Sequence, residues 1–121
     1  MSKQWYSRPI ICVSDLEASL AFYLDKLGFT QAWHFADEDG RGGVAQVDRA
    51  GTELILTSHW PDKASSSLIF ISLDPDVLDA ARAEFEGRGV EVKDGWWGYK
   101  LAIVEDPDGN KLFFPYPKDQ P

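Results

Sequence analysis

The pattern of apolar and polar positions at the start of the chain predicts a strand followed by a helix. Residues 8–13 form a short, mostly apolar run of strand length. Ser14 and Glu17 have the spacing of a capping box at a helix start, and Gly28 has the position of a helix stop. Between them, apolar residues recur at helical intervals and form one face: Leu16, Leu20, Tyr23, Leu24 and Leu27.

Three strand-like segments follow, separated by turn residues. They are expected at residues 29–36, 44–48 and 52–58, with a polar, glycine-rich loop at 37–43 and a turn at Ala50-Gly51. Side chains alternate between the two faces of a strand, so Trp33 and Phe35 are expected on the same face.

A similar order of elements begins again after a polar loop at residues 59–66. Asp74 with Pro75 predicts a helix start after a strand at 67–73. A closing hairpin is expected around the turn Asp106–Asn110, because aspartate, proline and glycine favour tight turns. The chain is therefore predicted to be a single α+β domain, 1–121. It would contain two βαβββ modules, at about 6–58 and 67–116, forming a cupped mixed sheet with helices on the outer face.

Composition narrows the classes of partner. The 121 residues carry a formal net charge of −8, which disfavours nucleic acid and anionic membranes as partners. The single cysteine, Cys12, excludes an internal disulfide, and no segment resembles a signal peptide or a membrane span. A cytoplasmic location is expected. Five tryptophans are many for a chain of this length, so a core, an interface or a ligand site that accommodates large rings is expected.

Several short motifs occur in a recognisable order: Ile11-x-Val13-x-Asp15-Leu16-Glu17, Phe22-Tyr23, Leu27-Gly28-Phe29, and Trp97-Gly98 followed by Glu105-Asp106-Pro107-Asp108-Gly109-Asn110. Together they resemble the glyoxalase/bleomycin-resistance/extradiol-dioxygenase superfamily, also called vicinal-oxygen-chelate proteins, and are most similar to its bleomycin-resistance branch. The resemblance implies paired βαβββ modules, usually in a homodimer that completes the ligand clefts.

The resemblance also implies where a metal would be held in the enzymes of this superfamily. The matching positions here are Arg8, Ile55, Ser67 and Phe113, none of which is a competent ligand. No metal and no other cofactor is therefore predicted. An alternative stays open, because Glu53, His34 and His59 could rebuild a site in an enzyme with non-standard ligands. Cys12 is interpreted as a small apolar residue rather than a nucleophile.

Alternation along the strands predicts what lines the cup. Ser67, Ile69 and Ile71 are expected to face it, whereas Leu68 and Phe70 are expected to pack under a helix. Aromatic rings suit planar ligands and carboxylates suit cationic ones. The predicted ligand-binding residues are Trp33, Phe35, Glu53, Ile55, Trp60, Ile69, Trp96, Trp97, Tyr99 and Phe113.

The sequence thus predicts a metal-free, homodimeric protein that sequesters a cationic or aromatic antibiotic of the bleomycin type. Three alternatives remain open: a glyoxalase- or dioxygenase-like enzyme, a module for another small molecule, and a protein-binding or peptide-binding module. Some of the rings are equally compatible with a core or dimer interface. Arg8 is compatible with an anion anchor or with a salt bridge to Glu53.

Overall fold

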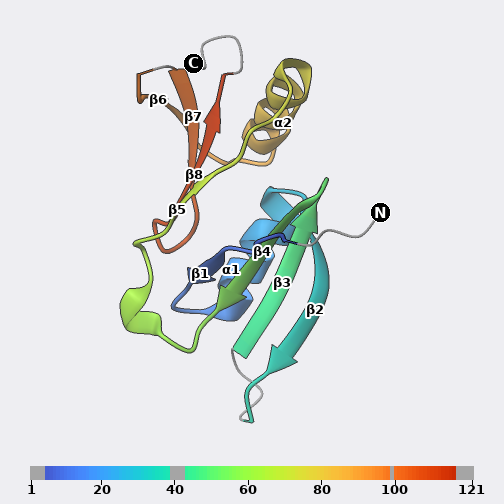
Figure 1. Ribbon diagram of the computed structural model, residues 1–121, viewed down its shortest axis with the longest axis vertical. Helices are drawn as coiled ribbons and strands as arrows, with labels where there is room; N and C mark the ends of the chain where they lie inside the picture. Colours follow the sequence, from blue (N-terminus) through green and yellow to red (C-terminus); the bar gives the residue numbers. More distant parts are fainter. Residues whose placement is uncertain (1–4, 39–42, 99, 117–121) are drawn as a thin grey trace.

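A computed structural model of the protein describes residues 5–38, 43–98 and 100–116. It has a mixed α+β fold with two four-stranded sheets, each built from one βαβββ unit. The two units lie one above the other along the long axis of the molecule (Figure 1). The first unit contains β1 (Ile10–Cys12), α1 (Leu16–Ala21), a π-helical turn (Phe22–Lys26), β2 (Thr30–Ala36), β3 (Gly43–Arg49) and β4 (Thr52–Thr57). The second contains β5 (Leu68–Phe70), α2 (Pro75–Gly87), β6 (Val92–Trp96), β7 (Lys100–Glu105) and β8 (Lys111–Pro115), and a 3-10 turn at Pro61–Lys63 precedes it.

Both sheets have the same topology. Their strand orders are β1-β4-β3-β2 and β5-β8-β7-β6. In each sheet one pair, β1 with β4 or β5 with β8, is parallel, and the other two pairs are antiparallel. The predicted repetition of the βαβββ order is therefore confirmed.

The start of α1 differs in detail from the predicted capping box. Asp15 is the N-cap, and its carboxylate accepts a hydrogen bond from the backbone N–H of Ala18 at 3.1 Å. Ser14 instead donates its backbone N–H to Asp108 at 3.0 Å, across to the second unit. The sequence pattern could not show which of the adjacent residues Ser14 and Asp15 caps the helix. Ser14 bonds instead to Asp108, which lies 94 positions away in the chain.

The helices bury one face of each sheet. A single hydrophobic cluster runs through both units, and its members include Ile11, Val13, Leu16, Tyr23, Leu54, Leu56, Leu78, Phe85, Leu112 and Phe114. The apolar face predicted for the first helical segment is confirmed, because Leu16, Leu20, Tyr23 and Leu27 are buried and Leu24 packs against the cluster. Val77 of α2 is 47% exposed, whereas Leu78, Ala81 and Phe85 of the same helix are buried.

The prediction for β5 was wrong by one residue. Leu68 and Phe70 are exposed, whereas Ile69 packs against the core and Ile71 is buried. The reason is the parallel ladder, in which Ile69 lies beside Leu112 and Phe70 beside Phe113. Neighbours across a ladder share a face, so β5 follows β8. A strand that is apolar at every position carries no signal for the choice of face.

A buried hydrogen-bond network joins the two units. Asp106 accepts a hydrogen bond from the Tyr23 hydroxyl at 3.1 Å and from the Asn110 side-chain amide at 2.9 Å. That amide also donates to the backbone carbonyl of Cys12 at 3.1 Å, and its oxygen accepts from the Ser67 N–H at 3.0 Å. Burial and the Asp106 carboxylate raise the pKa of Tyr23 well above its ordinary value, so the hydroxyl stays a donor.

None of the helices in the described residues is both long enough and apolar enough to cross a membrane.

We predict that Asn110→Asp lowers the free energy of unfolding by about 3 kcal/mol, because it places a carboxylate against Asp106 and the Cys12 carbonyl in a buried site. Gln31→Glu is the matched control, since it makes the same chemical change on an exposed strand and should shift stability by no more than about 0.5 kcal/mol. Urea unfolding followed by circular dichroism measures both. Equal stability of the two variants would contradict the assignment of the network.

Candidate ligand-binding site

Each sheet has one face that no helix of its unit covers, and these open faces carry most of the exposed large side chains. On the first sheet the ladders place Ile10, Ile55, Gln46 and Trp33 in one row across all four strands. Phe35 shares this face, because it pairs with Val44, which in turn pairs with Thr57. We call this surface the polar face, after the hydrogen-bonded group at its centre.

Gln46 holds that group together. It is 5% exposed, and its side-chain oxygen accepts hydrogen bonds from Arg8 at 2.9 Å and from the Trp33 indole N–H at 3.0 Å. Its amide nitrogen donates to Asp48 at 2.8 Å and more weakly to Glu53 at 3.4 Å. Arginine and tryptophan side chains are donors only, so the group that faces them must be the amide oxygen. Gln46 therefore sets the orientation of Trp33.

The charges of the polar face are partly balanced. Arg8 Nε lies 4.0 Å from a carboxylate oxygen of Glu53, which favours the salt bridge among the two interpretations left open for Arg8. Asp48 and Glu53 together outnumber Arg8 by one charge, so the three side chains leave a small excess of negative charge beside the Trp33 ring.

The open face of the second sheet is an aromatic groove. Its volume is about 330 Å³, and it is lined by Leu68, Trp96, Trp97, Leu101, Ile103 and Phe113. The Trp97 ring lies 5.9 Å from the Phe113 ring and 6.0 Å from the Phe70 ring, centroid to centroid. These distances are in the range of favourable ring packing. Trp96 and Trp97 remain mostly exposed, so their rings are available to a ligand.

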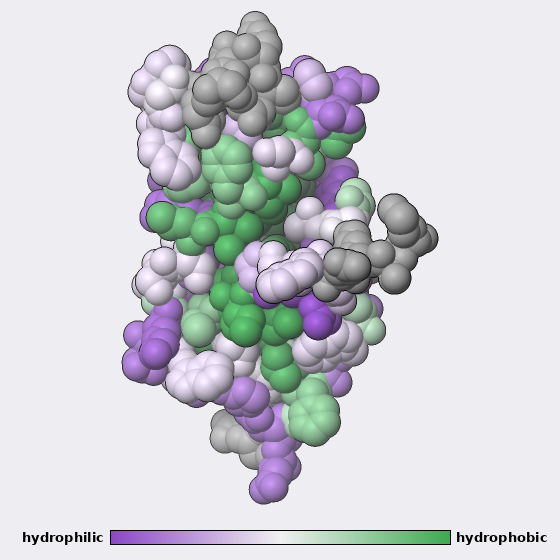
Figure 2. Space-filling model, in the orientation of Figure 1, coloured by the Kyte–Doolittle hydropathy of each residue, from purple (hydrophilic) through white to green (hydrophobic). Residues whose placement is uncertain are grey.

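Hydrophobic residues form a band down the middle of the molecular face seen in Figure 2, over both halves of the molecule. Polar residues border the band on both sides. A continuous exposed apolar surface of this kind is typical of an interaction site.

The structure gathers the predicted site residues into two groups. Trp33, Phe35, Glu53 and Ile55 share the polar face, and Trp96, Trp97 and Phe113 share the aromatic groove. Trp60 lies in the connecting segment, where its ring packs against His59, itself 2.8 Å from Asp37. Ile69 lies on the helix-covered side, and Tyr99 falls outside the described residues. The binding role of each of these residues stays a prediction.

Several other residues of the two faces were not identified as ligand-binding from the sequence. Gln46 gave no sequence signal, because one amide in a strand is unremarkable until its four partners are known. Leu68 and Phe70 were assigned to the wrong face. Leu101 and Ile103 could have been found, since alternation along β7 places them on the face opposite Ala102 and Val104.

The register also corrects one of the four metal positions. Arg8 lies two residues before Ile10, and Ile10 pairs with Ile55. In the second unit Phe70 is the counterpart of Ile10, because it pairs with Phe113. The counterpart of Arg8 therefore lies two residues before Phe70. That residue is Leu68, not Ser67. The four positions are then Arg8, Ile55, Leu68 and Phe113, which do not fit a metal ion. Within the described residues, no three His, Cys, Asp or Glu side chains are grouped so that they could hold one.

Comparisons with known proteins agree with this geometry. The sequence model of the Glyoxalase/Bleomycin resistance protein/Dioxygenase superfamily matches residues 5–114. A bleomycin resistance protein from Staphylococcus aureus is 28% identical over 127 aligned positions, which cover 89% of this chain and 93% of the relative.

Two solved structures are similar over nearly their full length. TnmS3, an antibiotic binding protein from Streptomyces sp. CB03234, has a TM-score of 0.71 at 28% identity, covering 95% of this chain and 98% of its own. The bleomycin-binding protein of Streptomyces verticillus, solved with copper(II)-bleomycin, has a TM-score of 0.70 at 25% identity and the same coverage.

We predict that Gln46→Met speeds solvent exchange of the Trp33 indole proton about fivefold, because the hydrogen bond it loses is worth about 1 kcal/mol. Proton–nitrogen NMR measures this exchange, and Trp33→Phe assigns the resonance. Gln31→Met, on an exposed position of the same strand as Trp33, is the control and should leave all indole signals unchanged. An unchanged Trp33 exchange rate in Gln46→Met would show that Gln46 does not hold the ring.

Proposed function

The chain belongs to the Glyoxalase/Bleomycin resistance protein/Dioxygenase superfamily, and we propose that it is one of the family's binders: a protein that sequesters a cationic, aromatic antibiotic of the bleomycin type without changing it. The similar proteins that are described as binding or resisting an antibiotic support this proposal. In sequestration the protein lowers the free concentration of the drug, so its capacity is set by its own concentration and by the dissociation constant.

One observation carries the choice of binding over catalysis. The four positions from which the family's enzymes hold a metal carry an arginine and three hydrocarbon side chains. A catalytic divalent metal needs about three nitrogen, oxygen or sulfur ligands from the protein. These side chains can therefore contact a ligand but cannot hold a metal for catalysis.

The two open faces provide complementary parts of such a contact. In the aromatic groove, Trp97 and Phe113 offer ring surfaces on which a planar heteroaromatic group can stack. On the polar face, Asp48 and Glu53 offer carboxylates to a cationic group. The formal net charge of −8 adds a long-range attraction for a cationic drug.

We propose that these parts meet in a homodimer in the cytoplasm. Side chains as large as Ile10, Phe35, Leu68 and Trp96 are exposed on the two faces. Pairing the polar face of one chain with the aromatic groove of a second chain would cover them and enclose a ligand between them. Sedimentation at micromolar concentration tests this, and a monomer that still binds drug would refute the paired groove.

We predict that Trp97→Ala weakens bleomycin binding about tenfold or more, because it removes a stacking surface worth about 1.5 kcal/mol. Trp5→Ala removes a tryptophan that is 91% exposed and does not line the groove, and it should leave the dissociation constant within about twofold. Isothermal titration calorimetry measures both. Absence of any binding of bleomycin by the unchanged protein at micromolar concentration would overturn the drug-binding proposal.

The competing function is that of an enzyme with non-standard metal ligands, because the superfamily also includes enzymes such as glyoxalases and dioxygenases. We predict that protein purified without chelators contains less than about one tenth of an equivalent of zinc, nickel, manganese or iron, because the described residues of the open faces offer no ligand set. Elemental analysis measures this. A full equivalent of metal that is lost in Glu53→Gln would favour the enzyme instead.

A further inference from the structure

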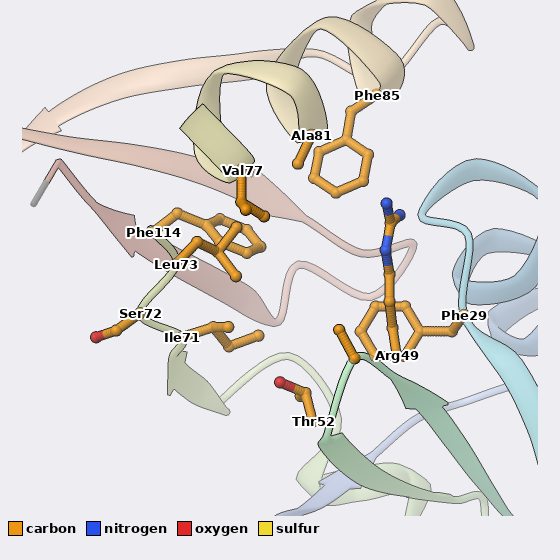
Figure 3. Close-up of a pocket in the computed structure, with 11 residues that line it drawn as sticks. Phe29, Arg49, Thr52, Ile71, Ser72, Leu73, Val77, Ala81, Phe85 and Phe114 are labelled. Carbon is orange, nitrogen blue, oxygen red and sulfur yellow. The ribbon is translucent and has the colours of Figure 1, made fainter. Parts of the chain in front are cut away.

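A second cavity lies between the two units on their helix-covered side (Figure 3). Its volume is about 110 Å³, and its walls include Phe29, Arg49, Thr52, Ile71, Phe85 and Phe114. Protein interiors leave few voids larger than a water molecule. An apolar cavity of roughly this size in another protein stays free of water and binds benzene. The volume is therefore suited to one small ring.

This cavity is separate from the aromatic groove. Phe114 lines the cavity and Phe113 lines the groove, and adjacent residues of β8 point to opposite faces of the sheet. A ligand in the cavity would contact α2 and the end of β3, neither of which lines the groove. The two can be occupied independently.

The walls favour a neutral aromatic molecule. Rings close the cavity from both units, and the Phe85 and Phe114 rings lie 6.1 Å apart, centroid to centroid. The Arg49 guanidinium is already engaged, because it contacts both carboxylate oxygens of Glu84 at 2.8 and 2.9 Å and lies 5.8 Å from the Phe85 ring centroid. Glu84 is shared with Arg88, whose Nη1 also lies 2.8 Å from it, but both terminal nitrogens of Arg49 already donate to Glu84 and one also donates to the Leu27 carbonyl, so they are not free to bind an anion.

Two hydroxyl-bearing residues, Thr52 and Ser72, line the wall, and Figure 3 shows the Ser72 oxygen directed away from the other lining side chains. The Thr52 hydroxyl makes no side-chain hydrogen bond with the described part of the chain, and Figure 3 shows its oxygen directed towards Ile71. A hydroxyl can both donate and accept a hydrogen bond. It can therefore fix the orientation of a ligand that carries a single polar substituent.

We propose that this cavity is an accessory site for a neutral, single-ring aromatic molecule of the phenol class, with its ring among Phe29, Phe85 and Phe114 and its hydroxyl on Thr52. The site joins the two units, since Phe29 and Thr52 belong to the first and Phe85 and Phe114 to the second. Its occupation does not depend on the proposed binding of an antibiotic.

The probes for the test are 4-fluorophenol and fluorobenzene, followed by fluorine NMR during titration of the full-length protein. Both should bind saturably, with 4-fluorophenol binding at least threefold more tightly because only it reaches Thr52. Thr52→Val should remove this preference while leaving the affinity for fluorobenzene unchanged. Failure of either probe to saturate up to millimolar concentration would overturn the proposal.

A pair of variants on α2 locates the site. Ala81→Leu fills the cavity and should abolish saturable binding of both probes, whereas Ala80→Leu makes the same change on the exposed side of the helix and should not. Val77→Phe, at a half-exposed wall position, is a second filling variant in case Ala81→Leu does not fold.

Bleomycin titration of the folded filling variants separates this site from the groove. Loss of probe binding in a filling variant that still binds bleomycin as the unchanged protein does would support the accessory site. The same holds if neither the unchanged protein nor any variant binds bleomycin. Probe binding that survives in both filling variants, or that disappears only with Trp97→Ala, would assign the probes to the groove and refute the site.

Discussion

The buried hydrogen bonds of Asp106 and Asn110 are the constraint on which the arrangement of the two units depends. The turn between β7 and β8 is closed by Asp106, which accepts from the backbone of residues 108 and 110. The same side chains reach Tyr23, Cys12 and Ser67, which belong to the first unit and to the start of the second. Because Asp106, Asn110 and Tyr23 are buried and hydrogen-bonded to one another or to their neighbours, separating the units would leave several polar atoms unsatisfied. The network lies on the helix side of the sheets, and the opposite faces are left open to solvent.

The two open faces have equivalent backbones and different chemistry. In both units a parallel ladder brings an apolar residue of the first strand beside one of the last: Ile10 beside Ile55, and Phe70 beside Phe113. The first unit then places Gln46 and its charged partners next to the ladder, whereas the second places Trp97 there. A repeated fold thus yields one surface suited to cations and one suited to rings. Under the proposed function, the two surfaces would therefore have to act together on one ligand.

Periodicity predicted most of the fold because most elements have one buried and one exposed face. The helix at Leu16 and the helix that starts at Pro75 were found from their spacing and caps, and β4 and β8 from their alternation. The failures share a physical cause. In β5 every residue is apolar, so the side facing the core was decided by pairing with β8. At the start of the first helix, Ser14 was expected to be the cap, but it bonds to Asp108 of the second unit and Asp15 caps the helix instead.

The sequence by itself determined the repeated βαβββ order, the family resemblance and the absence of metal-ligating side chains at three of the four expected positions. These follow from residue identity and local spacing, which need no knowledge of distant contacts. Only the tertiary structure decided that Leu68 occupies the fourth position, that Gln46 orients Trp33, and that a cavity separates Phe29 from Phe114. Each of these depends on which residues meet across strands or units, and such meetings are set by packing and register rather than by the neighbouring sequence.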